Sequence, residues 1–551
     1  TVKLGKPYVY DSIAYCNFPP SADSLITATM RNRLVKAGEQ FNAAAMEEER
    51  NRLNSLFRNN GYYYYQPGYI NYLADTVSVP GMVSMRVQPL NNLSPQISRI
   101  WKIGEINLRV TNENMGLSRG MKADTLKGRN FTYVYYGDKP PVRLGALLRN
   151  IQIRRGELYS HDSQQLSLQR MGQMNIFSSV NFNLTPRSDS DTLDVNISAQ
   201  LDKPYDLTFE LNVTSKSNDQ IGPGSKISIA RRNVFRGGET LKLSLTGSYE
   251  WQTDKNVKGR AAVINSWEMG ADVSLTFPRL FFPIIHRRHL RMPSSTSLRI
   301  FTNQMNRSGF FRMIRAGGDA TYKIYSHSKI FTKTTTTHTV IPFRLSYDML
   351  LSTTAKFDSI AAGNRSIENS FRNQFIPAMQ YTFTYDNAST GHRNKTWLEA
   401  SVTSAGNVTS LMFAAFGKSL SEKNKNIKGN PYAQFIKATA EIRQLWRINS
   451  NHYIATRMML GAIHSYGNSD YAPYSEQFHI GGANSLRAFT VRSVGPGSYH
   501  PSGENRYSYL DETGTLKFET NVEYRFRLVA DLHGAIFADA GNIWLMKKDP
   551  E

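Results

Sequence analysis

The feature that most constrains this chain is a regular alternation of apolar and polar residues that begins after Pro204. It first appears at Leu207, Phe209, Leu211 and Val213, four apolar residues that alternate with Asp, Thr, Glu and Asn. The same period recurs at 241–251, 269–277 and 516–526, with turns and polar segments between the strands. A period of two places all the apolar side chains of a strand on one face. This half of the chain is therefore predicted to be all-β.

Two all-β architectures fit the alternation, a soluble sandwich and a transmembrane β-barrel. No stretch approaches the roughly 20 apolar residues that a spanning helix needs, which excludes a helical membrane protein. The mean hydropathy of −0.44 suits either β fold. In a membrane barrel the apolar side chains face lipid, the polar ones face the lumen, and closure satisfies the backbone. Because the strands recur without intervening helices and aromatic residues make up 11% of the chain, we favour the barrel.

The chain carries 66 Lys and Arg against 44 Asp and Glu, a net charge of +22. Such an excess suits nucleic acid, anionic lipid or an acidic substrate. The charges form neither a basic tail nor an aromatic stacking platform, so nucleic-acid binding is not expected. A barrel whose lumen and rims are basic, beside anionic outer-membrane lipid, is the better interpretation.

The segment before Pro204 contains a repeated α+β pattern. In its first copy, residues 2–15 read as a strand, and a helix follows Gly38-Glu39 and ends at Gly61. Residues 62–65 and 82–89 then read as strands. In the second copy 151–155 reads as a strand, Gly156-Glu157 echoes Gly38-Glu39, and Ser160 is the predicted N-cap of a helix. Strands are expected at 177–184 and 192–201, and a repeat of this size indicates tandem modules.

Residues 476–499 form a glycine-rich segment with an unusual arginine motif. It contains Gly481, Gly482, Arg487, Ala488, Phe489 and Arg492, and a Phe-x-Asp-x-Gly sequence follows at Phe537, Asp539 and Gly541. Closely spaced glycines let a backbone fold back on itself and aim Arg487 inward. The combination resembles the inward-folded loop and following strand of the BamA/TamA superfamily of outer-membrane barrel proteins. An ordinary ordered surface loop is the alternative.

The resemblance implies POTRA modules in the periplasm followed by an outer-membrane barrel of about 16 strands. It divides the chain into a POTRA-like module at 1–90, a final POTRA-like module at 91–203 and a barrel at 204–551. The phrases at 48–53 and 58–63 are especially similar to the TamL branch. The sequence opens within an apparent strand and stops at Glu551 without a terminal alternating strand. We therefore expect a longer native chain whose closing strands are truncated or disordered.

By the same resemblance, the loop arginine is Arg487, and it pairs in the lumen with Asp539 and with Glu523 on the preceding strand. Phe537 shares a face with Asp539 by strand periodicity. Ala488 stands where the family motif has glycine, which puts the geometry of the loop tip in question because alanine resists positive φ. We expect this clamp to hold the loop against the barrel wall and keep the barrel competent. Ordinary ion pairs in the lumen are the alternative.

The resemblance also implies a function in assembling, inserting or translocating outer-membrane proteins. The first strand, Leu207 to Val213, would template client strands at a lateral gate. POTRA modules would capture extended segments at a sheet edge, or act only as spacers. Expected partners are nascent outer-membrane proteins, outer-membrane lipid, and a TamB-like periplasmic protein or other assembly subunits. The rivals are a two-partner-secretion transporter with one client, a role in lipid transport, a barrel lipase and a soluble binding sandwich.

Enzyme and metal signatures are weak, and we predict neither catalysis nor a cofactor. Residues 116–120 match G-x-S-x-G around Ser118 but lack the strand–turn–helix context of a nucleophile elbow. His286 and His289 flank two arginines that would repel a metal ion. Cys16 is the single cysteine, so the chain can form no internal disulfide.

Overall fold

A computed structural model describes residues 7–112, 123–188, 190–215, 220–252, 266–280, 294–307, 310–327, 335–363, 371, 373–388, 393–420, 422–423, 425–489, 491–499 and 512–547. The chain divides into two compact units. One comprises Thr1–Lys203 with Phe235–Gly238, and the other Pro204–Val234 with Glu239–Glu551.

The first unit begins with a three-stranded sheet of order β1-β3-β2, in which β1 and β3 are parallel. Two α-helices and two short 3₁₀ turns accompany this sheet. The elements are β1 (Val9–Tyr15), α1 (Pro20–Ala28), η1 (Met30–Asn32), α2 (Ala43–Arg58), η2 (Pro67–Tyr69), β2 (Ile70–Asp75) and β3 (Met82–Pro89). Apolar residues of α2 recur at helical spacing, and Leu53 and Phe57 are fully buried against the sheet.

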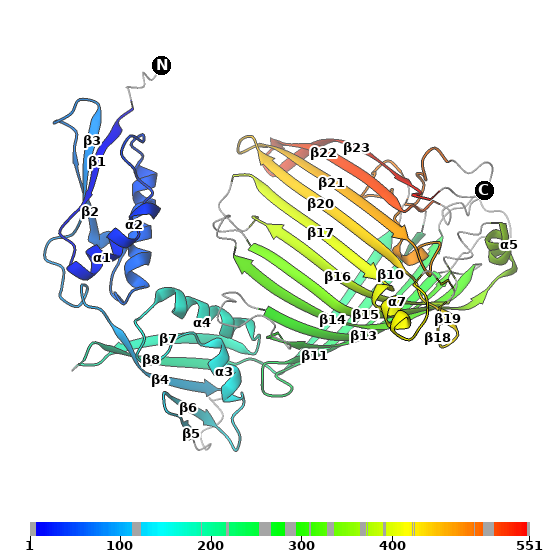
Figure 1. Cartoon of the computed structure of the whole chain (residues 1–551), viewed down its shortest axis with the longest axis horizontal. Helices are drawn as coiled ribbons and strands as arrows, with labels where there is room; N and C mark the ends of the chain where they lie inside the picture. The colour runs from blue at the N-terminus through cyan, green and yellow to red at the C-terminus, as the bar shows by residue number, and fades with distance from the viewer. Residues whose placement is uncertain are drawn as a thin grey trace. The chain divides into compact units, whose positions relative to one another are not determined.

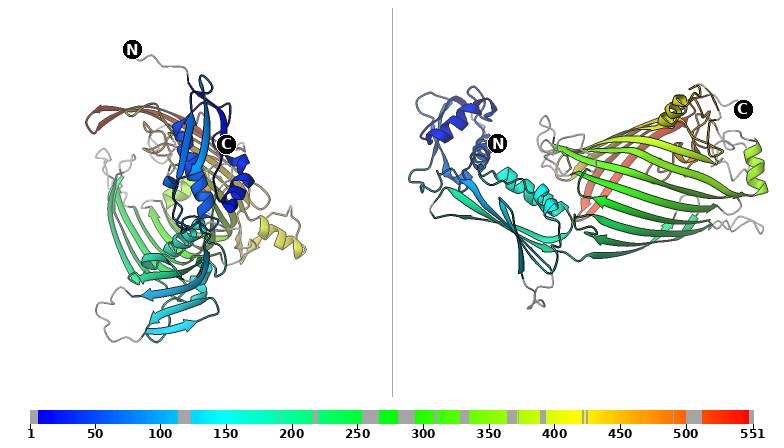
Figure 2. Two further views of the ribbon diagram at one scale, coloured as in Figure 1. Left: turned by 90° about the vertical axis from the view of Figure 1, so that its left-hand side faces the viewer. Right: turned by 60° about the horizontal axis from the view of Figure 1, so that its bottom comes forward.

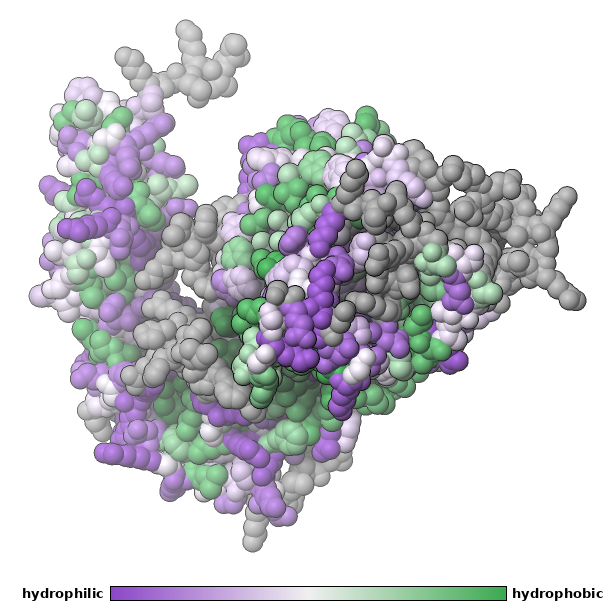
Figure 3. All heavy atoms as spheres, turned by 45° about the vertical axis from the view of Figure 1, so that its right-hand side comes forward, coloured by the Kyte–Doolittle hydropathy of each residue, from purple (hydrophilic) through white to green (hydrophobic). Residues whose placement is uncertain are grey.

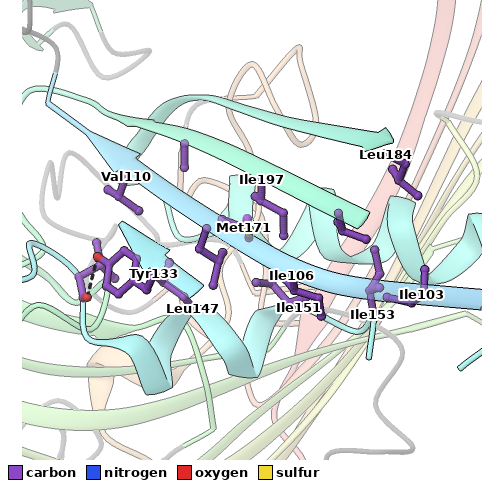
Figure 4. Packing of buried hydrophobic residues seen from close by; sticks show 14 of the residues in the cluster. Ile103, Ile106, Val110, Tyr133, Leu147, Ile151, Ile153, Met171, Leu184 and Ile197 are labelled. Atoms are coloured by element: carbon purple, nitrogen blue, oxygen red, sulfur yellow. Dashed lines mark hydrogen bonds between the residues drawn. The ribbon is translucent and has the colours of Figure 1, made fainter. Parts of the chain in front are cut away.

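A five-stranded sheet of order β5-β6-β4-β8-β7 follows, covered on one face by two helices (Figure 1). The elements are β4 (Lys102–Thr111), β5 (Ala123–Lys127), β6 (Phe131–Tyr136), α3 (Leu144–Asn150), α4 (His161–Gln173), β7 (Phe177–Pro186) and β8 (Thr192–Leu201). Alternate residues of β4 and β8 point into the core and meet Leu147 and Met171 of the helices (Figure 4). Within this core the hydroxyl of Tyr133 donates to the carbonyl of Val142, and burial raises the pKa of Tyr133 to about 12.

The predicted repeat is visible in the backbone. Gly38 and Gly156 both have φ of +85°, which glycine adopts without steric cost. Each is followed two residues later by an isolated antiparallel bridge, Val9 with Gln40 and Lys102 with Leu158. Side-chain N-caps then start both helices, because Asn42 accepts from the amide of Ala44 and Ser160 from that of Ser163. The N-cap predicted at Ser160 is confirmed.

Two predicted strands are wrong. Tyr62 to Tyr65 form turns rather than a strand, and their rings pack between the two modules, with Tyr63 edge-on to Tyr159 at 5.0 Å. Gly61 pairs its amide with the carbonyl of Tyr159 and its carbonyl with the amide of Trp101, both at 2.9 Å, so these backbone groups serve the module junction instead of a sheet. Residues 151–155 form no strand, and Ile153 is buried in the core of the second module.

Glu49 is a fully buried carboxylate in the first module. It accepts hydrogen bonds from Arg52 (2.6 and 2.8 Å), the hydroxyl of Tyr15 (2.7 Å) and the amide of Leu34 (2.9 Å). Burial alone would raise the pKa of Glu49, but these donors favour the charged form more strongly and lower it. The bond from the Leu34 amide to Glu49 ties α2 to the segment that follows α1, and the ion pair with Arg52 lies within α2 itself.

In the described residues the second unit forms a 13-stranded antiparallel sheet in which each strand pairs with its neighbours along the sheet. Its strands are β9 (Tyr205–Ser215), β10 (Gln220–Arg232), β11 (Thr240–Gln252), β12 (Ser266–Phe277), β13 (Ser294–Arg307), β14 (Phe311–His327), β15 (Thr335–Thr353), β16 (Gln374–Asp386), β17 (Lys395–Ala405), β20 (Phe435–Arg447), β21 (His452–Ser465), β22 (Leu516–Val529) and β23 (Leu532–Trp544). The small elements are α5 (Ala355–Gly363), α7 (Asn407–Ala415), β18 (Asn426–Ile427), β19 (Asn430–Pro431) and η3 (Tyr474–Glu476). The sheet curls strongly (Figure 2), and in the described part of the chain β9 and β23 are its two edge strands.

The two faces of this sheet have opposite chemistry. The outer face carries exposed apolar side chains such as Leu243, Met269, Ile300 and Val402. The inner face, which lines the lumen, carries ion pairs such as Arg299–Asp319 and Arg315–Asp348. Hydrophobic side chains also occupy broad areas of the surface in Figure 3. No helix in the described residues is long and apolar enough to cross a membrane. The predicted fold class, α+β modules followed by an all-β unit with apolar residues outward, is confirmed.

We predict that Glu49 makes the first module sensitive to acid. Because its folded pKa lies below the ordinary value of 4.5, the stabilisation that Glu49 provides is present above that value and is lost as the pH falls through the lower folded pKa. In the full chain, the α2 amides should therefore lose protection against hydrogen exchange as the pH falls through the folded pKa of Glu49. Glu49→Gln should already cost about 3 kcal/mol at neutral pH, because Arg52 keeps its charge without a partner.

The matched control is Glu48→Gln, which removes an exposed carboxylate from the neighbouring position. It should leave the exchange of α2 and its pH dependence unchanged. An acid response that survives Glu49→Gln would assign the effect to another group.

Candidate functional site

The segment between β21 and β22 folds back as a tight excursion along the inner face of the sheet. Its backbone is closed by hydrogen bonds from the amide of Gly482 to the carbonyl of Phe489 (2.8 Å) and from Arg492 to Ile480 (2.9 Å). Gly481 and Gly482 have φ of +103° and +96°, a region in which an L side chain is strained. These turns carry Arg487 to the wall formed by β22 and β23.

Arg487 lies in a cage of acidic and aromatic side chains. Its Nε and Nη2 donate to the two oxygens of Asp539 at 2.8 and 2.7 Å, and Nη1 donates to Glu523 at 2.7 Å. The Arg487 amide also donates to Asp539 at 3.1 Å. The guanidinium carbon lies 3.5 Å from the ring centre of Phe537, a cation–π contact. A bidentate pair of this kind fixes orientation as well as charge.

The register of β22 and β23 explains why these groups meet. Glu523 lies opposite Phe537 and Asn521 opposite Asp539, so all four side chains project from the inner face at adjacent levels. The side chain of Asp539 is 8% exposed, so it is substantially desolvated around the arginine. Desolvation offsets much of the attraction in such a pair.

Sequence reasoning missed a second layer of contacts beside Arg487. Asn521 donates from Nδ2 both to Asp539 and to the carbonyl of Ser485, each at 2.9 Å. Ser485 donates from its hydroxyl to Glu519 at 2.8 Å, and Glu519 is fully buried. Arg457 and Lys517 also pair with Glu519. The sequence pattern that could have identified these residues is the period of two, because Glu519, Asn521 and Glu523 occupy alternate positions of one strand and therefore share a face.

Apolar contacts and two wall glycines hold the base of the loop. Phe478, Ile480 and Leu486 are buried with side chains of β16, β17, β20, β21 and β23. A Cβ added to Gly461 would lie 2.4 Å from the ring of Phe478, and one added to Gly541 would lie 2.7 Å from Ile480. Gly541, predicted as part of the strand motif, thus makes room for a loop side chain.

The loop is also tied to two further strands of the sheet, β15 and β20. Glu476 pairs with Arg344 of β15 at 3.0 Å and with Lys437 of β20 at 3.1 Å. Ser475 donates to Asp348 of β15 at 3.3 Å. The loop therefore bridges two distant parts of one curled sheet.

The remaining predicted loop residues have separate roles. Ala488 is not among the described non-glycine residues with positive φ, so the local backbone accepts alanine where the family motif has glycine. Arg492 does have a left-handed φ of +62°, and its guanidinium lies over the ring of Tyr474 at 4.6 Å. Phe489 is half exposed. The first-strand residues 207–213 lie on β9, at the edge of the sheet remote from β22 and β23.

The arrangement is suited to holding a loop. A cavity of about 700 Å³ borders the loop tip, with Arg443, Arg457, Arg487 and Glu523 among its lining residues. Several of these charges are already paired with one another or with Glu441 and Asp539. Among the described residues no group of three or more His, Cys, Asp or Glu could hold a metal ion. Ser118, His286 and His289 lie outside the described residues.

Comparisons with known proteins agree with this architecture. A family model described as the Omp85 superfamily domain matches residues 265–549. BamA from Haemophilus ducreyi, solved without POTRA domains 1–3, is similar in structure with a TM-score of 0.52 and 13% identity, covering 98% of this chain and 88% of that chain. At such identity the likeness concerns the fold.

CdiB from Acinetobacter baumannii has a TM-score of 0.45 and 10% identity over 100% of this chain and 82% of that chain. POTRA domains 1–3 of Omp85 from Anabaena match 36% of this chain and 67% of that chain, with 15% identity and a TM-score of 0.17. No curated protein sequence matches significantly.

We predict that Arg487→Lys loosens the loop although it keeps the charge. A lysine ammonium cannot reproduce the two parallel bonds to Asp539 or the simultaneous bond to Glu523. The loss should be about 2 kcal/mol, roughly thirtyfold in the opening equilibrium, measured as faster hydrogen exchange of the amides of Gly482 and Phe489.

Arg525→Ala is the control for the arginine substitution. It removes a half-exposed partner of Glu523 without touching the loop, and exposed pairs contribute little. Unchanged protection of the loop in Arg487→Lys would show that the backbone bonds and apolar base hold the loop without the clamp.

We further predict that Gly461→Ala displaces Phe478 and the base of the loop. The added methyl would overlap the Phe478 ring, so the ring must shift. The barrel should then lose its compact, heat-modifiable electrophoretic form at a lower temperature than the native protein.

Gly247→Ala is a matched strand glycine, since an added Cβ would find only the Ser225 hydroxyl at 3.8 Å. It should behave as the native protein does. If both substitutions shift the transition equally, the effect reports strand propensity and not the space reserved for Phe478.

Proposed function

The chain belongs to the Omp85 superfamily, and on that premise we propose that it inserts or translocates outer-membrane proteins by pairing their strands with its own first strand. It is an outer-membrane protein with periplasmic POTRA modules, in a superfamily of assembly and transport proteins. The resemblance predicted from the loop and strand motifs is confirmed at this level. The proposed reaction is an exchange of hydrogen bonds and needs no bond cleavage.

One observation carries the proposal, the geometry of β9. In the described part of the chain β9 is hydrogen-bonded to β10 and lies at the edge of the sheet. Its outward side chains Leu207 and Leu211 are each 71% exposed.

Such an edge would have a strong drive to pair. Within a hydrocarbon layer each unpaired backbone N–H or C=O costs several kcal/mol, because no water is available to replace the partner. A client strand that aligns along β9 satisfies both edges at once. The apolar residues of β9 face outward, so a templated strand of the same period would also present its apolar side to lipid.

The loop site supports this function by fixing strands that lie far from β9 in the order of the sheet. Arg487 and Glu476 hold the loop to β22–β23 and to β15 and β20, far along the sheet from β9. We infer that these contacts keep the barrel in register while its first edge opens. A rigid body with one mobile edge is what a strand-exchange mechanism requires.

The POTRA modules would deliver clients to the barrel or bind a periplasmic partner. The sheet order β1-β3-β2 leaves β2 at an edge, where an extended segment can add as a further strand. We propose that a TamB-like protein is such a partner, and that the chain belongs to the TamL branch. The similarity of residues 48–53 to the TamL branch supports this assignment. These residues include Glu49 and Arg52, which form the buried ion pair.

We predict that a cysteine on β9 crosslinks to client strands. In a Cys16→Ser background, Leu211→Cys should form disulfides with a cysteine in the last strand of a nascent outer-membrane β-barrel protein. Several different clients should give adducts in cells that depend on this copy.

Ile300→Cys on the interior strand β13 is the matched control. Ile300 also faces outward and is 73% exposed, against 71% for Leu211, but β13 is paired on both sides. It should give no adducts. Equal labelling at both positions would indicate random collision in the membrane. Adducts with one secreted client alone would favour a two-partner-secretion transporter.

A further inference from the structure

Helix α7 is a rigid, uncharged helix on the outside of the sheet, between β17 and β20. It starts after Gly406, whose φ of +72° and hydrogen bond to the carbonyl of Pro377 turn the chain sharply out of β17. A Cβ on Gly406 would lie 2.4 Å from the carbonyl of Ala433. Gly417, with φ of +87°, ends the helix as a left-handed C-cap, and its amide bonds to Ala414.

The polar side of α7 is anchored to the wall. The Ser410 hydroxyl lies 2.7 Å from that of Tyr432 and donates to Gln434 at 2.9 Å. Asn407 accepts from Tyr466 at 2.8 Å and from Gln434 at 3.1 Å. The ring of Phe413 stacks on Tyr432. These contacts fix which side of the helix faces away from the protein.

The side that faces away is wholly apolar. Four exposed side chains share it, together with exposed Ala415: Val408 (51%), Leu411 (61%), Met412 (59%) and Phe416 (84%). They span roughly 140° of the helix at ~100° per residue. The helix contains no charged residue.

The exposed side continues the outer face of the sheet. Gln434, against which α7 packs, lies two positions before Ile436, so both point to the same face of β20 and its extension. Ile436 is 43% exposed and Val402, near the end of β17, is 50% exposed. In Figure 2, left, α7 (yellow) stands out sideways from the wall. The apolar face of the helix and the apolar band of the barrel are thus neighbours.

We propose that α7 lies in the outer leaflet of the outer membrane, with Val408, Leu411, Met412, Ala415 and Phe416 among lipid acyl chains. Lipid is favoured over a protein partner because the exposed arc has no hydrogen-bonding side chain and adjoins the lipid-facing band. The following segment adds the exposed Lys418, Lys423 and Lys428 with Glu422 as its one acid, a charge that suits anionic head groups. The helix would act as an interfacial anchor that fixes the depth of this side of the barrel.

The test places a fluorophore on single cysteines in a Cys16→Ser background of the full chain. Leu411→Cys reports the exposed arc, Val402→Cys reports the barrel's outer face, and Lys423→Cys reports a polar position whose side chain is 62% exposed. Each protein is reconstituted into phosphatidylcholine liposomes with and without brominated acyl chains. Leu411 and Val402 should lose about half of their fluorescence or more, and Lys423 should lose little.

Quenching at Leu411 that is no greater than at Lys423 would overturn the proposal. A second result would also overturn it: weak quenching of the Leu411→Cys label in liposomes, together with protection of the unlabelled Leu411→Cys thiol from an impermeant maleimide in intact cells. A protein partner would then cover the helix. Met412→Cys repeats the measurement at a second position of the arc. All these positions are exposed, so the labelled proteins should keep the heat-modifiable form of the native chain.

Discussion

Backbone groups in a hydrocarbon layer must find partners within the protein, and this requirement shapes the second unit. It accounts for one long antiparallel sheet, in which the thirteen strands of the described residues pair in chain order. It also determines where the side chains lie, because a strand that is paired on both edges projects its side chains only from the two faces of the sheet. Apolar residues go to the lipid and charges to the lumen. An edge strand is then the one place where unsatisfied backbone can carry a function.

The lumen creates the opposite difficulty, since a loop that enters it must be held without a compact core. The chain solves this with contacts at three levels. Arg487 binds acids on β22 and β23, Glu476 binds cations on β15 and β20, and Phe478 and Ile480 fill the space over Gly461 and Gly541. Because desolvation offsets much of each ion pair, their combined effect is chiefly on position. The backbone hairpin of the loop adds the stiffness that single ion pairs lack.

Much of the fold and of the loop site could be predicted from residue patterns. The predictions failed where a residue's contacts depend on segments that are distant in the sequence. The period of two identified β9, β11, β12 and β22, and the repeated Gly-Glu phrase located the second module with its N-cap at Ser160. The motif linked Arg487 to Asp539 and Glu523. Contacts that depend on register, such as those of Asn521 and Glu519 with Ser485, could not be seen before the strands were aligned. The tyrosines at 62–65 have strand propensity, but the module junction outweighs it.

That junction has a mechanical consequence. Gly61 exchanges hydrogen bonds with Tyr159 and Trp101, Arg58 donates to the Tyr159 hydroxyl, and Asn59 accepts from the Ser160 hydroxyl and the Asp162 amide. A hinge needs backbone that is free to rotate, and here the backbone groups of the first module are hydrogen-bonded to those of the second. The two modules therefore form a stiff lever of fixed bend, so that a pull on the first sheet is transmitted to the second with little loss to flexing between them.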